Sequence, residues 1–502
     1  MAELNPAHPP GRYPVVIVGS GPGGLQLSYA LTRLGINHAV VSEDGSPGGM
    51  FQRFPILQRL ISWSKPHAPA ERGTRSYERF DWNSLIGDEP AHRAILPQVM
   101  DGSSYFPSRS EMEKGLAAFA ERAGLAIRYG CKWESIARED DEFVLTTSDG
   151  EYRSRVVVFA VGMAEPWKPS IPGIEEVPHY AETRPPRDYA GKSLFIVGKR
   201  NSGFELADGL LPWARQIILA SPHSALLSVV TRSLVGARAR YLQPYEDHVL
   251  GGGNLIMDLS IERIERTTEG YRIHAYGTTV PGRHMIDCDE VIAATGFQVP
   301  MRNLRDLGVV TIMQDRLPAQ TPFWESATVS GIYFAGTISQ GATELKKYGI
   351  PSSSAAVQGF RYNALILARH IAEKHFGIEQ ARPALRPESV VDFLLSEATE
   401  APELWSQRSY LARVVEADES GGLVDGGIVP LAHFVDSSGP DGAAIAVEND
   451  ESGDIHPALY VRSRGEVEEF LFPSSPMHDY RSQDYRMAMK DKVDALCAKA
   501  GV

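Results

Sequence analysis

Cysteine is scarce in this chain. Its 502 residues include three cysteines, Cys131, Cys288 and Cys497, and they stand far apart. No C-x-x-C or C-x4-C pair occurs, so the sequence disfavours an enzyme that passes electrons through neighbouring thiols. We expect all three to be small buried hydrophobic residues in a reducing compartment.

Long apolar runs, a secretory signal and long basic runs are also missing. No stretch approaches the roughly eighteen consecutive apolar residues that cross a bilayer, and MAELNPAHPPGRYP at the start lacks a basic and then apolar stretch. We therefore expect a cytoplasmic protein without a membrane partner. The net charge of -13 argues against a nucleic-acid partner and for a small molecule. The 14 histidines show no H-x-x-x-H or H-E-x-x-H spacing, so we predict no metal.

Glycine is abundant and is placed in a clear pattern near the N-terminus. The run PVVIVGSGPGG is typical of a buried strand that breaks into a glycine turn before the helical LQLSYALTRLG. Gly19 permits the tight turn, Gly21 lets the backbone approach a pyrophosphate, and Gly24 lets helix and strand pack closely. The next strand, HAVVSE, ends at Glu43, where a carboxylate accepts bonds from ribose hydroxyls. The turn predicts a dinucleotide site at Gly19, Gly21, Pro22, Gly23 and Gly24.

A second turn of the same kind follows in KSLFIVGKRNSGFELADGL. Gly198 and Gly203 stand at the first and last glycine positions, and Arg200 replaces the middle one. A guanidinium at this position can pair with a phosphate oxygen. Asn201 and Ser202 can cap the helix and donate toward the same anion. We predict a second dinucleotide site here.

The residues after this turn bear on which nucleotide binds. The strand QIILA ends at Ser221 without a carboxylate, and Arg232, Arg238 and Arg240 follow. A missing acid with arginines nearby favours a 2′-phosphate, and hence NADPH over NADH. The arginines fit a solvated face equally well.

Other strand-like runs end in small residues. VVVFAVG ends at Gly162, DEVIAATGF passes through Thr295 and Gly296, and GIYFAGT ends at Gly336 and Thr337. Small residues let the chain pass close to a cofactor, and ligands of open α/β sheets bind at these strand ends. We expect these residues to border the two nucleotides.

The last quarter of the chain is less informative. A helix with a serine cap near Ser353 and a glycine stop at Gly377 is predicted, and its dipole can support negative charge on the cofactor. Beyond it, residues 383–405 read as helix, followed by short strand-like pieces. This region could cap a substrate pocket or pair subunits, and the sequence leaves the oligomeric state unknown.

With these residues placed, the chain resembles the FAD- and NADPH-dependent monooxygenases, which include flavin-containing monooxygenases, N-hydroxylating monooxygenases and Baeyer-Villiger enzymes. The resemblance rests on the Gly19 motif, GGMF, the GKRNSG turn and ATGF, and spans roughly residues 14–372. Within this group the chain is similar to FAD-dependent oxidoreductase-domain proteins typified by an ER-associated degradation flavoprotein, through RLISWSK, DWNSL, YFP and GFRYNA.

The resemblance implies an α/β fold with two Rossmann-like dinucleotide-binding domains, one for FAD and one for NADPH, and a C-terminal appendage. The GGMF residues Gly49, Met50 and Phe51 join the FAD contacts. The FAD-binding domain is expected in two segments, at 12–165 and 296–377. The NADPH-binding domain is expected between them at 166–295, and the appendage at 378–502.

The same resemblance implies a single-component monooxygenase. NADPH reduces FAD, oxygen adds to give a C(4a)-hydroperoxide, and a small molecule is oxygenated, with N-hydroxylation ahead of S- or C-oxygenation. Ser62 stands where flavin-containing monooxygenases usually carry an asparagine, and Lys65 follows three residues later. Both are candidate catalytic residues in contact with flavin or NADP+. The Baeyer-Villiger fingerprint lacks its phenylalanine and has His179 displaced, which ranks ester formation lower.

Two alternatives stay open. A single-component halogenase would use halide at the same hydroperoxide and a lysine to guide the oxidant, for which Lys65, Lys346 or Lys347 could serve. A redox-sensing or scaffolding flavoprotein would bind FAD without oxygenating anything.

Overall fold

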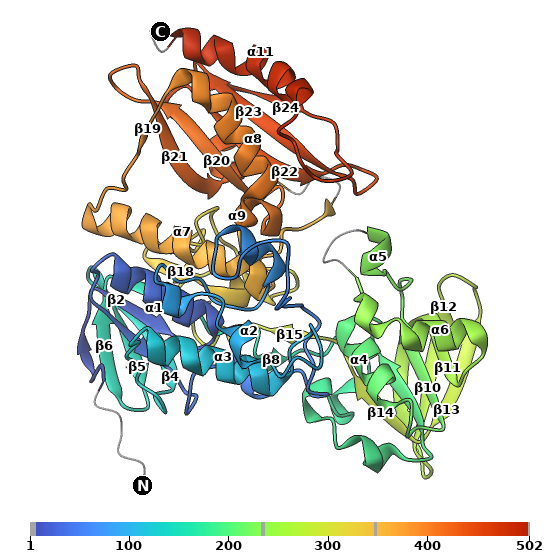
Figure 1. Cartoon of the computed structure of the whole chain (residues 1–502). Coiled ribbons are helices and arrows are strands. Elements are labelled where there is room, and N and C mark those ends of the chain that lie inside the picture. The colour runs from blue at the N-terminus through green and yellow to red at the C-terminus, as the bar shows by residue number, and fades with distance from the viewer. Residues whose placement is uncertain (1–6, 232–235, 346–348, 500–502) are drawn as a thin grey trace. The chain divides into compact units, whose positions relative to one another are not determined.

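The computed structural model describes residues 7–231, 236–345 and 349–499 (Figure 1). The chain forms two compact units. Unit 1 comprises Met1–Gln52, Ser62–Gly162 and Val299–Val502, and unit 2 comprises Arg53–Ile61 and Met163–Gln298. The mixed α/β fold predicted from the sequence is confirmed.

The central sheet of unit 1 is parallel and fully buried. Its order is β18-β7-β2-β3, with β2 at Val15–Val18, β3 at His38–Val41, β7 at Val156–Phe159 and β18 at Ile332–Phe334. Runs that are almost entirely apolar suit strands that are covered on both faces. Helices α1 (Pro22–Arg33) and α7 (Val357–Phe376) pack against each other beside this sheet (Figure 1). All four strands therefore end at one edge.

A second layer of unit 1 is antiparallel apart from its parallel β1–β6 pair. Its order is β1-β6-β5-β4, with β1 at Gly11–Arg12, β4 at Trp133–Glu139, β5 at Glu142–Thr147 and β6 at Gly150–Ser154. Helix α2 spans Leu96–Val99, and α3 spans Arg109–Arg122. Ser108 and Glu111 form a capping box that fixes the start of α3.

Short elements lie in the connections of unit 1. They are the strand pair β16 (Thr311–Ile312) and β17 (Leu317–Pro318) and the 3-10 helices η1 (Gly49–Gln52), η2 (Ser76–Phe80), η3 (Pro90–His92) and η8 (Gly336–Gly341). Helix α7 ends at Gly377, in the left-handed conformation (φ 64°), as predicted. The predicted serine cap was wrong, because Ala356 is the N-cap and no side chain caps the helix.

Unit 2 contains one sheet of order β13-β12-β11-β10-β9-β14. Its parallel strands are β9 (Ser193–Val197), β10 (Gln216–Ser221) and β14 (Glu290–Ala293). The beginning of β11 (Asn254–Arg266) is parallel to β10. The rest of β11 forms an antiparallel meander with β12 (Tyr271–Gly277) and β13 (Arg283–Cys288). Its helices are α4 (Asn201–Leu210), α5 (Ser228–Thr231) and α6 (Gln243–Leu250), its 3-10 helices are η4 (Ile174–Glu176), η5 (Tyr180–Glu182), η6 (Pro186–Tyr189) and η7 (Ala239–Tyr241), and β8 (Glu165–Pro166) pairs with β15 (Phe297–Gln298).

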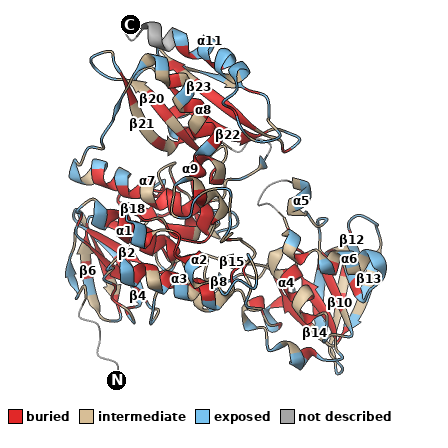
Figure 2. Ribbon diagram, in the orientation of Figure 1, coloured by how far each residue is buried: buried red, intermediate tan, exposed pale blue. Residues whose placement is uncertain are grey.

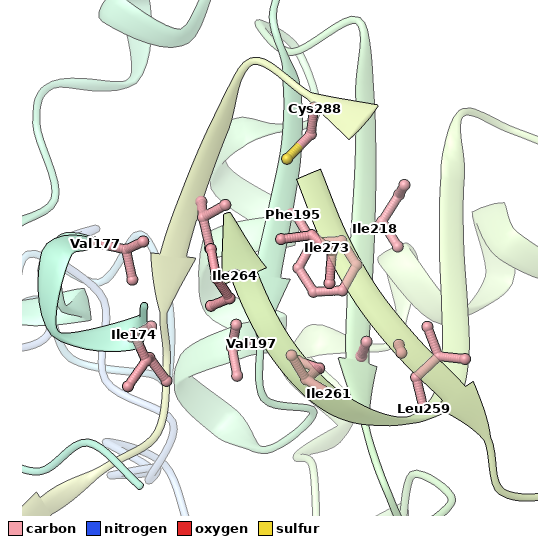
Figure 3. Close-up of a cluster of buried hydrophobic side chains, with 14 residues drawn as sticks. Ile174, Val177, Phe195, Val197, Ile218, Leu259, Ile261, Ile264, Ile273 and Cys288 are labelled. Atoms are coloured by element: carbon pink, nitrogen blue, oxygen red, sulfur yellow. The ribbon is translucent and has the colours of Figure 1, made fainter. Parts of the chain in front are cut away.

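A cluster of buried hydrophobic side chains packs between the strands of this sheet. Figure 3 shows Phe195 of β9 beside Ile273 of β12 and Ile261 of β11. Each of these side chains is at most 9% exposed. Their burial holds the meander over the parallel strands and so fixes the strand ends of unit 2.

The C-terminal region forms a six-stranded sheet of order β19-β21-β20-β22-β23-β24, which we call the C-terminal sheet. Its strands are β19 (Ala384–Leu385), β20 (Leu411–Ala417), β21 (Leu423–Pro430), β22 (Gly442–Asn449), β23 (Ile455–Ser463) and β24 (Glu466–Leu471), and its helices are η10 (Pro387–Ser389), α8 (Val390–Glu400), α9 (Pro402–Ser406), α10 (Leu431–Asp436) and α11 (Gln483–Lys499). We call this sheet and its helices together the C-terminal domain.

The predicted order of helix and then strands is present in this region, but the helical segment is divided and the strands form one sheet. Strand β22 is buried along its whole length, as Figure 2 shows, and helices α8 and α11 both contact it. The segment read as one helix contains β19 and separate helices, because Pro402 starts a new helix. Among the residues that the structure describes, no helix is long and apolar enough to cross a membrane.

Candidate functional site: two dinucleotide turns

The first glycine turn leaves no room for side chains. Gly19 follows β2 with φ 113°, and a Cβ there would lie 2.5 Å from the carbonyl oxygen of Ala160. A Cβ on Gly24 would lie less than 3.0 Å from the Gly19 oxygen. The spacing predicted from the sequence therefore corresponds to a turn that only glycine fits.

The same turn meets two other glycine segments. A Cβ on Gly23 would lie less than 3.0 Å from Cα of Gly336, the first residue of η8 after β18. A Cβ on Gly49 would lie 2.9 Å from Cα of Gly21. The structure thus brings together, at one edge of the sheet, glycines that stand far apart in the sequence.

The start of α1 is free to bind an anion. Gly21 is its N-cap and Pro22 its first residue, and no side chain caps this end. The unpaired amides and the helix dipole of such an N-terminus attract phosphate. This geometry fits the pyrophosphate of FAD.

Glu43 lies just beyond β3 and is accessible. Its side chain is 53% exposed, and Oε2 lies 4.0 Å from Nη2 of Arg302. Behind it, buried Ser42 shares a hydrogen bond of 2.8 Å with Ser20 of the glycine turn. The carboxylate is therefore held at the end of β3 by a packed turn while its oxygens remain available to a ribose.

The other predicted FAD contacts line the same edge. Gly162 follows β7 with φ 66°, and a Cβ there would lie 3.6 Å from Sδ of Met50. Phe51 donates its backbone N–H to the carbonyl of Gly48, and Thr337 accepts from Nε2 of Gln340 through its carbonyl. Met50, Phe51 and Thr337 are half-buried.

The hydroxyl of Ser62 is held by a buried asparagine. Ser62 Oγ donates to Oδ1 of Asn83 at 2.5 Å, and Asn83 is 1% exposed. Asn83 in turn donates to Oγ of Ser64, which donates to Oδ1 of Asp81 at 2.6 Å. The hydrogen of Ser62 is thus committed to Asn83, which leaves the oxygen lone pairs of Ser62 as acceptors.

Lys65 lies beside an aromatic cluster. Its Nζ lies 5.7 Å from the ring centroid of Trp63, which packs edge-on against Trp82 at 5.1 Å. Its backbone N–H donates to the carbonyl of Phe80. Lys346 and Lys347 lie outside the described residues, so Lys65 is the one candidate lysine that the structure places.

A cluster of charged side chains holds the loop that contains Asp81 and Ser84. Arg361 is 1% exposed and donates to the carbonyls of Asp81 and Ser84 at 2.7 Å each. Its Nη2 also donates to the carbonyl of Glu78, whose carboxylate accepts from Tyr362. Burial raises the pKa of Glu78 to about 7 although Arg361 opposes the shift. This carboxyl therefore titrates near neutral pH.

Glu78 makes the stability of the protein dependent on pH. Between pH 4.5 and about 7 the folded protein keeps a proton that the unfolded chain has released. The free energy of unfolding should therefore fall, by about 3 kcal/mol, as the pH rises through this window. Glu78→Gln should flatten that dependence in urea unfolding measured from pH 4 to 8. Glu121→Gln, at an exposed position, should leave it intact, and an unchanged slope in Glu78→Gln would refute the assignment.

The second glycine turn has the same backbone form. Gly198 follows β9 with φ 124°, and a Cβ on Gly203 would lie less than 3.0 Å from the Gly198 oxygen. Arg200 is the N-cap of α4 and is exposed, with no side chain capping the helix. Ser202, in the first turn of α4, is half-buried. The end of this helix is thus free for phosphate, with the Arg200 guanidinium in solvent beside it.

Asn201 has a different role from the predicted helix cap. Its Oδ1 accepts from the backbone N–H of Arg238 at 3.0 Å, and its Nδ2 donates to the carbonyl of Gly236 at 3.3 Å. Asn201 therefore ties the arginine segment to the glycine turn.

Arg238 is a half-buried cation close to this turn. Its Nε is buried and makes no hydrogen bond to any residue that the structure describes. Burial alone lowers the pKa of Arg238 to about 10. A desolvated guanidinium beside a helix N-terminus is a strong attractor for phosphate. Arg240, also half-buried, follows, and Arg232 lies outside the described residues.

The strand end at Ser221 has an acid that the sequence analysis missed. Asp258 of β11 stands in register with Ser221 of β10. Lys199, which follows Gly198 and is 4% exposed, forms an ion pair with Asp258, and Ser224 and Thr279 also donate to it. Burial opposes the ionisation of Asp258, but these hydrogen bonds lower its pKa to about 2. The carboxylate is charged and neutralised by lysine.

Thr295 and Gly296 follow β14. Thr295 Oγ1 donates to the carbonyl of Trp167 at 2.5 Å, and Gly296 has φ 92°. The carbonyl of Gly296 accepts from the Trp167 N–H and faces Nε2 of His179 at 2.9 Å. His179 is 1% exposed and caps a 3-10 helix, which is a structural role.

The sequence of this chain is similar to that of a known protein family. Residues 16–336, more than half of the chain, match the family model of the pyridine nucleotide-disulphide oxidoreductases. FAD-dependent oxidoreductase domain-containing protein 2 of Mus musculus is 27% identical over 440 residues, which are 80% of this chain and 64% of the mouse protein. The match thus spans less than two thirds of that relative.

Two further proteins extend the comparison. YUCCA9 of Arabidopsis thaliana, named as a probable indole-3-pyruvate monooxygenase, is 28% identical over 231 residues, 44% of this chain and 47% of that protein. The solved structure of bacillithiol disulfide reductase Bdr from Bacillus cereus has a TM-score of 0.55 and 19% identity, and the match covers 72% of this chain and 99% of that chain. At this low identity, the similarity to Bdr shows a shared fold and nothing more.

The glycine turns, the strand order and the extent of the family match agree, and they confirm the resemblance predicted from the sequence. The chain belongs to the pyridine nucleotide-disulphide oxidoreductase family.

Proposed function

We propose that this protein is an FAD-containing, NADPH-dependent monooxygenase that oxygenates a small molecule, with an amine nitrogen as the first choice of target. The FAD domain comprises residues 12–165 and 296–377, and the NADPH domain comprises residues 166–295. Two observations together carry the proposal. The chain has two glycine turns with open helix N-termini, and it has no closely spaced pair of cysteines.

The cysteines argue against disulfide chemistry. A reductase that relays electrons to a disulfide needs two thiols within bonding reach. Cys131 and Cys288 are both buried, they lie in different units, and burial raises the pKa of each thiol. Such thiols are poor nucleophiles. The name of the Arabidopsis relative favours oxygenation instead.

FAD, when bound, supplies the redox and oxygen chemistry. The chain's own residues position it. The first turn of α1 binds the pyrophosphate, and Glu43 accepts hydrogen bonds from the ribose. Gly49, Met50, Phe51, Gly162, Gly336 and Thr337 form the surrounding wall.

NADPH binds in unit 2. The first turn of α4 receives its pyrophosphate with Arg200 beside it, and Arg238 receives the 2′-phosphate. The Lys199–Asp258 ion pair cancels the acid that would otherwise repel that phosphate. Thr295 and Gly296 form the wall at the end of β14.

When FAD is bound, Ser62 would present the lone pairs of its fixed hydroxyl to the flavin, and Lys65 would supply a positive charge beside it. Ser62→Ala should raise the share of NADPH electrons that end as hydrogen peroxide by about fivefold, the effect of losing one hydrogen bond. The exposed Ser110→Ala is the control. Peroxide yield per NADPH oxidised measures the effect, and equal yields in both variants would remove Ser62 from the site.

Oxygen-isotope labelling tests the proposed reaction directly. The purified protein is supplied with NADPH, ¹⁸O2 and a panel of primary amines, sulfides and ketones. Monooxygenation predicts one ¹⁸O atom in the product for each NADPH consumed above the peroxide background. Consumption of NADPH with peroxide as the sole product across the panel would instead favour a flavoprotein that does not oxygenate.

A further inference from the structure

The C-terminal sheet lies beyond the family match, which ends at residue 336. The C-terminal domain nevertheless makes polar contacts with the rest of unit 1, at η2 and at α7. These contacts include hydrogen bonds from named side chains, which can be followed from the C-terminal domain to η8.

Arginines anchor the domain to η2. Arg75 donates to both oxygens of Glu397 at 2.7 and 2.9 Å, and it also bonds Glu403. Burial opposes the charge on Arg75, but the paired carboxylates raise its pKa. Arg79 donates to the carbonyl of Thr399 and lies 4.0 Å from the ring centroid of Trp405. Planar guanidinium pairs of this kind fix orientation as well as distance.

Gln407, just after α9, contacts buried side chains of α7 and of the segment before it. It is 0% exposed, and its Nε2 donates to Oδ1 of Asn363 at 2.5 Å and to Oγ of Ser354 at 2.9 Å. Its Oε1 makes no hydrogen bond to any residue that the structure describes. The side chain of Gln407 therefore makes these contacts through one nitrogen, toward α7 and the segment before it.

Asn363 connects Gln407 to η8 through hydrogen bonds. Its Nδ2 donates to Oγ of Ser339 and to Oγ of Ser354, both at 3.1 Å. Ser339 lies in η8, whose first residue, Gly336, touches Gly23 of α1. The chain of hydrogen bonds thus runs from the C-terminal domain to the turn that closes on the first helix.

A glycine in α7 makes room for the side chain of Gln407. A Cβ on Gly359 would lie 2.9 Å from Oε1 of Gln407, and it would also strike the carbonyl of Ser353. Gly359 is thus needed for the close approach of Gln407 to α7.

We propose that Gln407 is a positioning residue for the flavin site, through which the C-terminal domain holds η8 and the start of α7 in the conformation that binds FAD. The donor at Gln407 fixes the amide of Asn363, because Asn363 Oδ1 accepts from it while Nδ2 faces the serines. Without that donor, the amide is free to turn, and Ser339 loses the hydrogen bond that Asn363 donates to it. This inference rests on the proposed FAD site.

Gln407→Leu tests the proposal, because it keeps most of the volume and removes the donor. We expect FAD to bind about tenfold more weakly, which corresponds to about 1.4 kcal/mol. We also expect a shifted flavin midpoint potential and an altered visible spectrum in the FAD-saturated variant. Gln483→Leu, at an exposed position of α11, is the matched control and should resemble the wild type.

The outcomes separate the two proposals. A lower melting temperature with unchanged FAD affinity, potential and spectrum would give Gln407 a merely structural role and overturn this inference. Failure of the wild-type protein itself to bind FAD would overturn the proposed function instead. If Gln407→Leu does not fold, Ser354→Ala removes only the shared hydroxyl and should shift the same three readouts in the same direction to a smaller extent, and no shift would refute the relay.

Discussion

Gly23→Ala should give a folded protein that no longer retains FAD. The new methyl carbon would lie less than 3.0 Å from the backbone of Gly336, so α1 and η8 must move apart. Both segments border the predicted pyrophosphate site, and a displacement of about 1 Å at such a site costs on the order of a hundredfold in binding or rate. The FAD dissociation constant, measured by flavin fluorescence during titration of the apoprotein, should rise by that order.

Gly45→Ala is the matched control for this experiment. Gly45 is exposed in the same region, and a Cβ there meets nothing within 4 Å. This variant should bind FAD like the wild type. If Gly23→Ala retains FAD with unchanged affinity while its circular dichroism stays native, the close approach of these two glycines does not shape the flavin site.

Arg238→Ala should weaken NADPH binding by about a hundredfold, because removing one partner of a desolvated charge pair costs about 2–5 kcal/mol. NADH lacks the 2′-phosphate and should bind nearly as it does to the wild type. The ratio of the two KM values, from anaerobic flavin reduction at varied nucleotide concentration, reports the change. The melting temperature should not fall, since Nε of Arg238 makes no hydrogen bond to any described residue.

Arg263→Ala is the control for the charge alone. Arg263 lies in the same unit, and its side chain is 57% exposed. Its loss should leave both KM values unchanged. Equal losses for NADPH and NADH in Arg238→Ala would assign this arginine to a phosphate that both nucleotides share, and no loss for either would remove it from the site.

Local patterns in the sequence predicted the turns well. The first unit's strand, glycine turn and helix span fewer than twenty residues from Val15 to Arg33, and their geometry follows from backbone sterics within that segment. The ends of β7 and β18 were likewise predicted by small residues after apolar runs. The parallel order of the strands then brings Gly19, Gly162 and Gly336 to one edge.

The support of the site could not be predicted, because it depends on contacts between distant segments. Ser62 bonds Asn83 across 21 residues, and Gln407 bonds Asn363 across 44. Asp258 reaches the end of β10 from a neighbouring strand, although no carboxylate follows β10 in the sequence. Hydrogen-bonding side chains of this kind carry no periodicity that marks their partners.

The serine cap expected near Ser353 was wrong, and the helix expected at residues 383–405 is divided into α8 and α9. Ala356 is the extended N-cap of α7, and Pro387 and Pro402 begin new helical turns because proline suits the first position of a helix.

Anaerobic mixing of the FAD-loaded protein with NADPH, followed by mixing with aerated buffer, tests the central claim most directly. We predict that NADPH bleaches the visible flavin absorbance faster than NADH does, and that oxygen is consumed before the oxidised flavin spectrum returns. Flavin that stays oxidised in the presence of NADPH would contradict the assignment of the second glycine turn and, with it, the proposed monooxygenase.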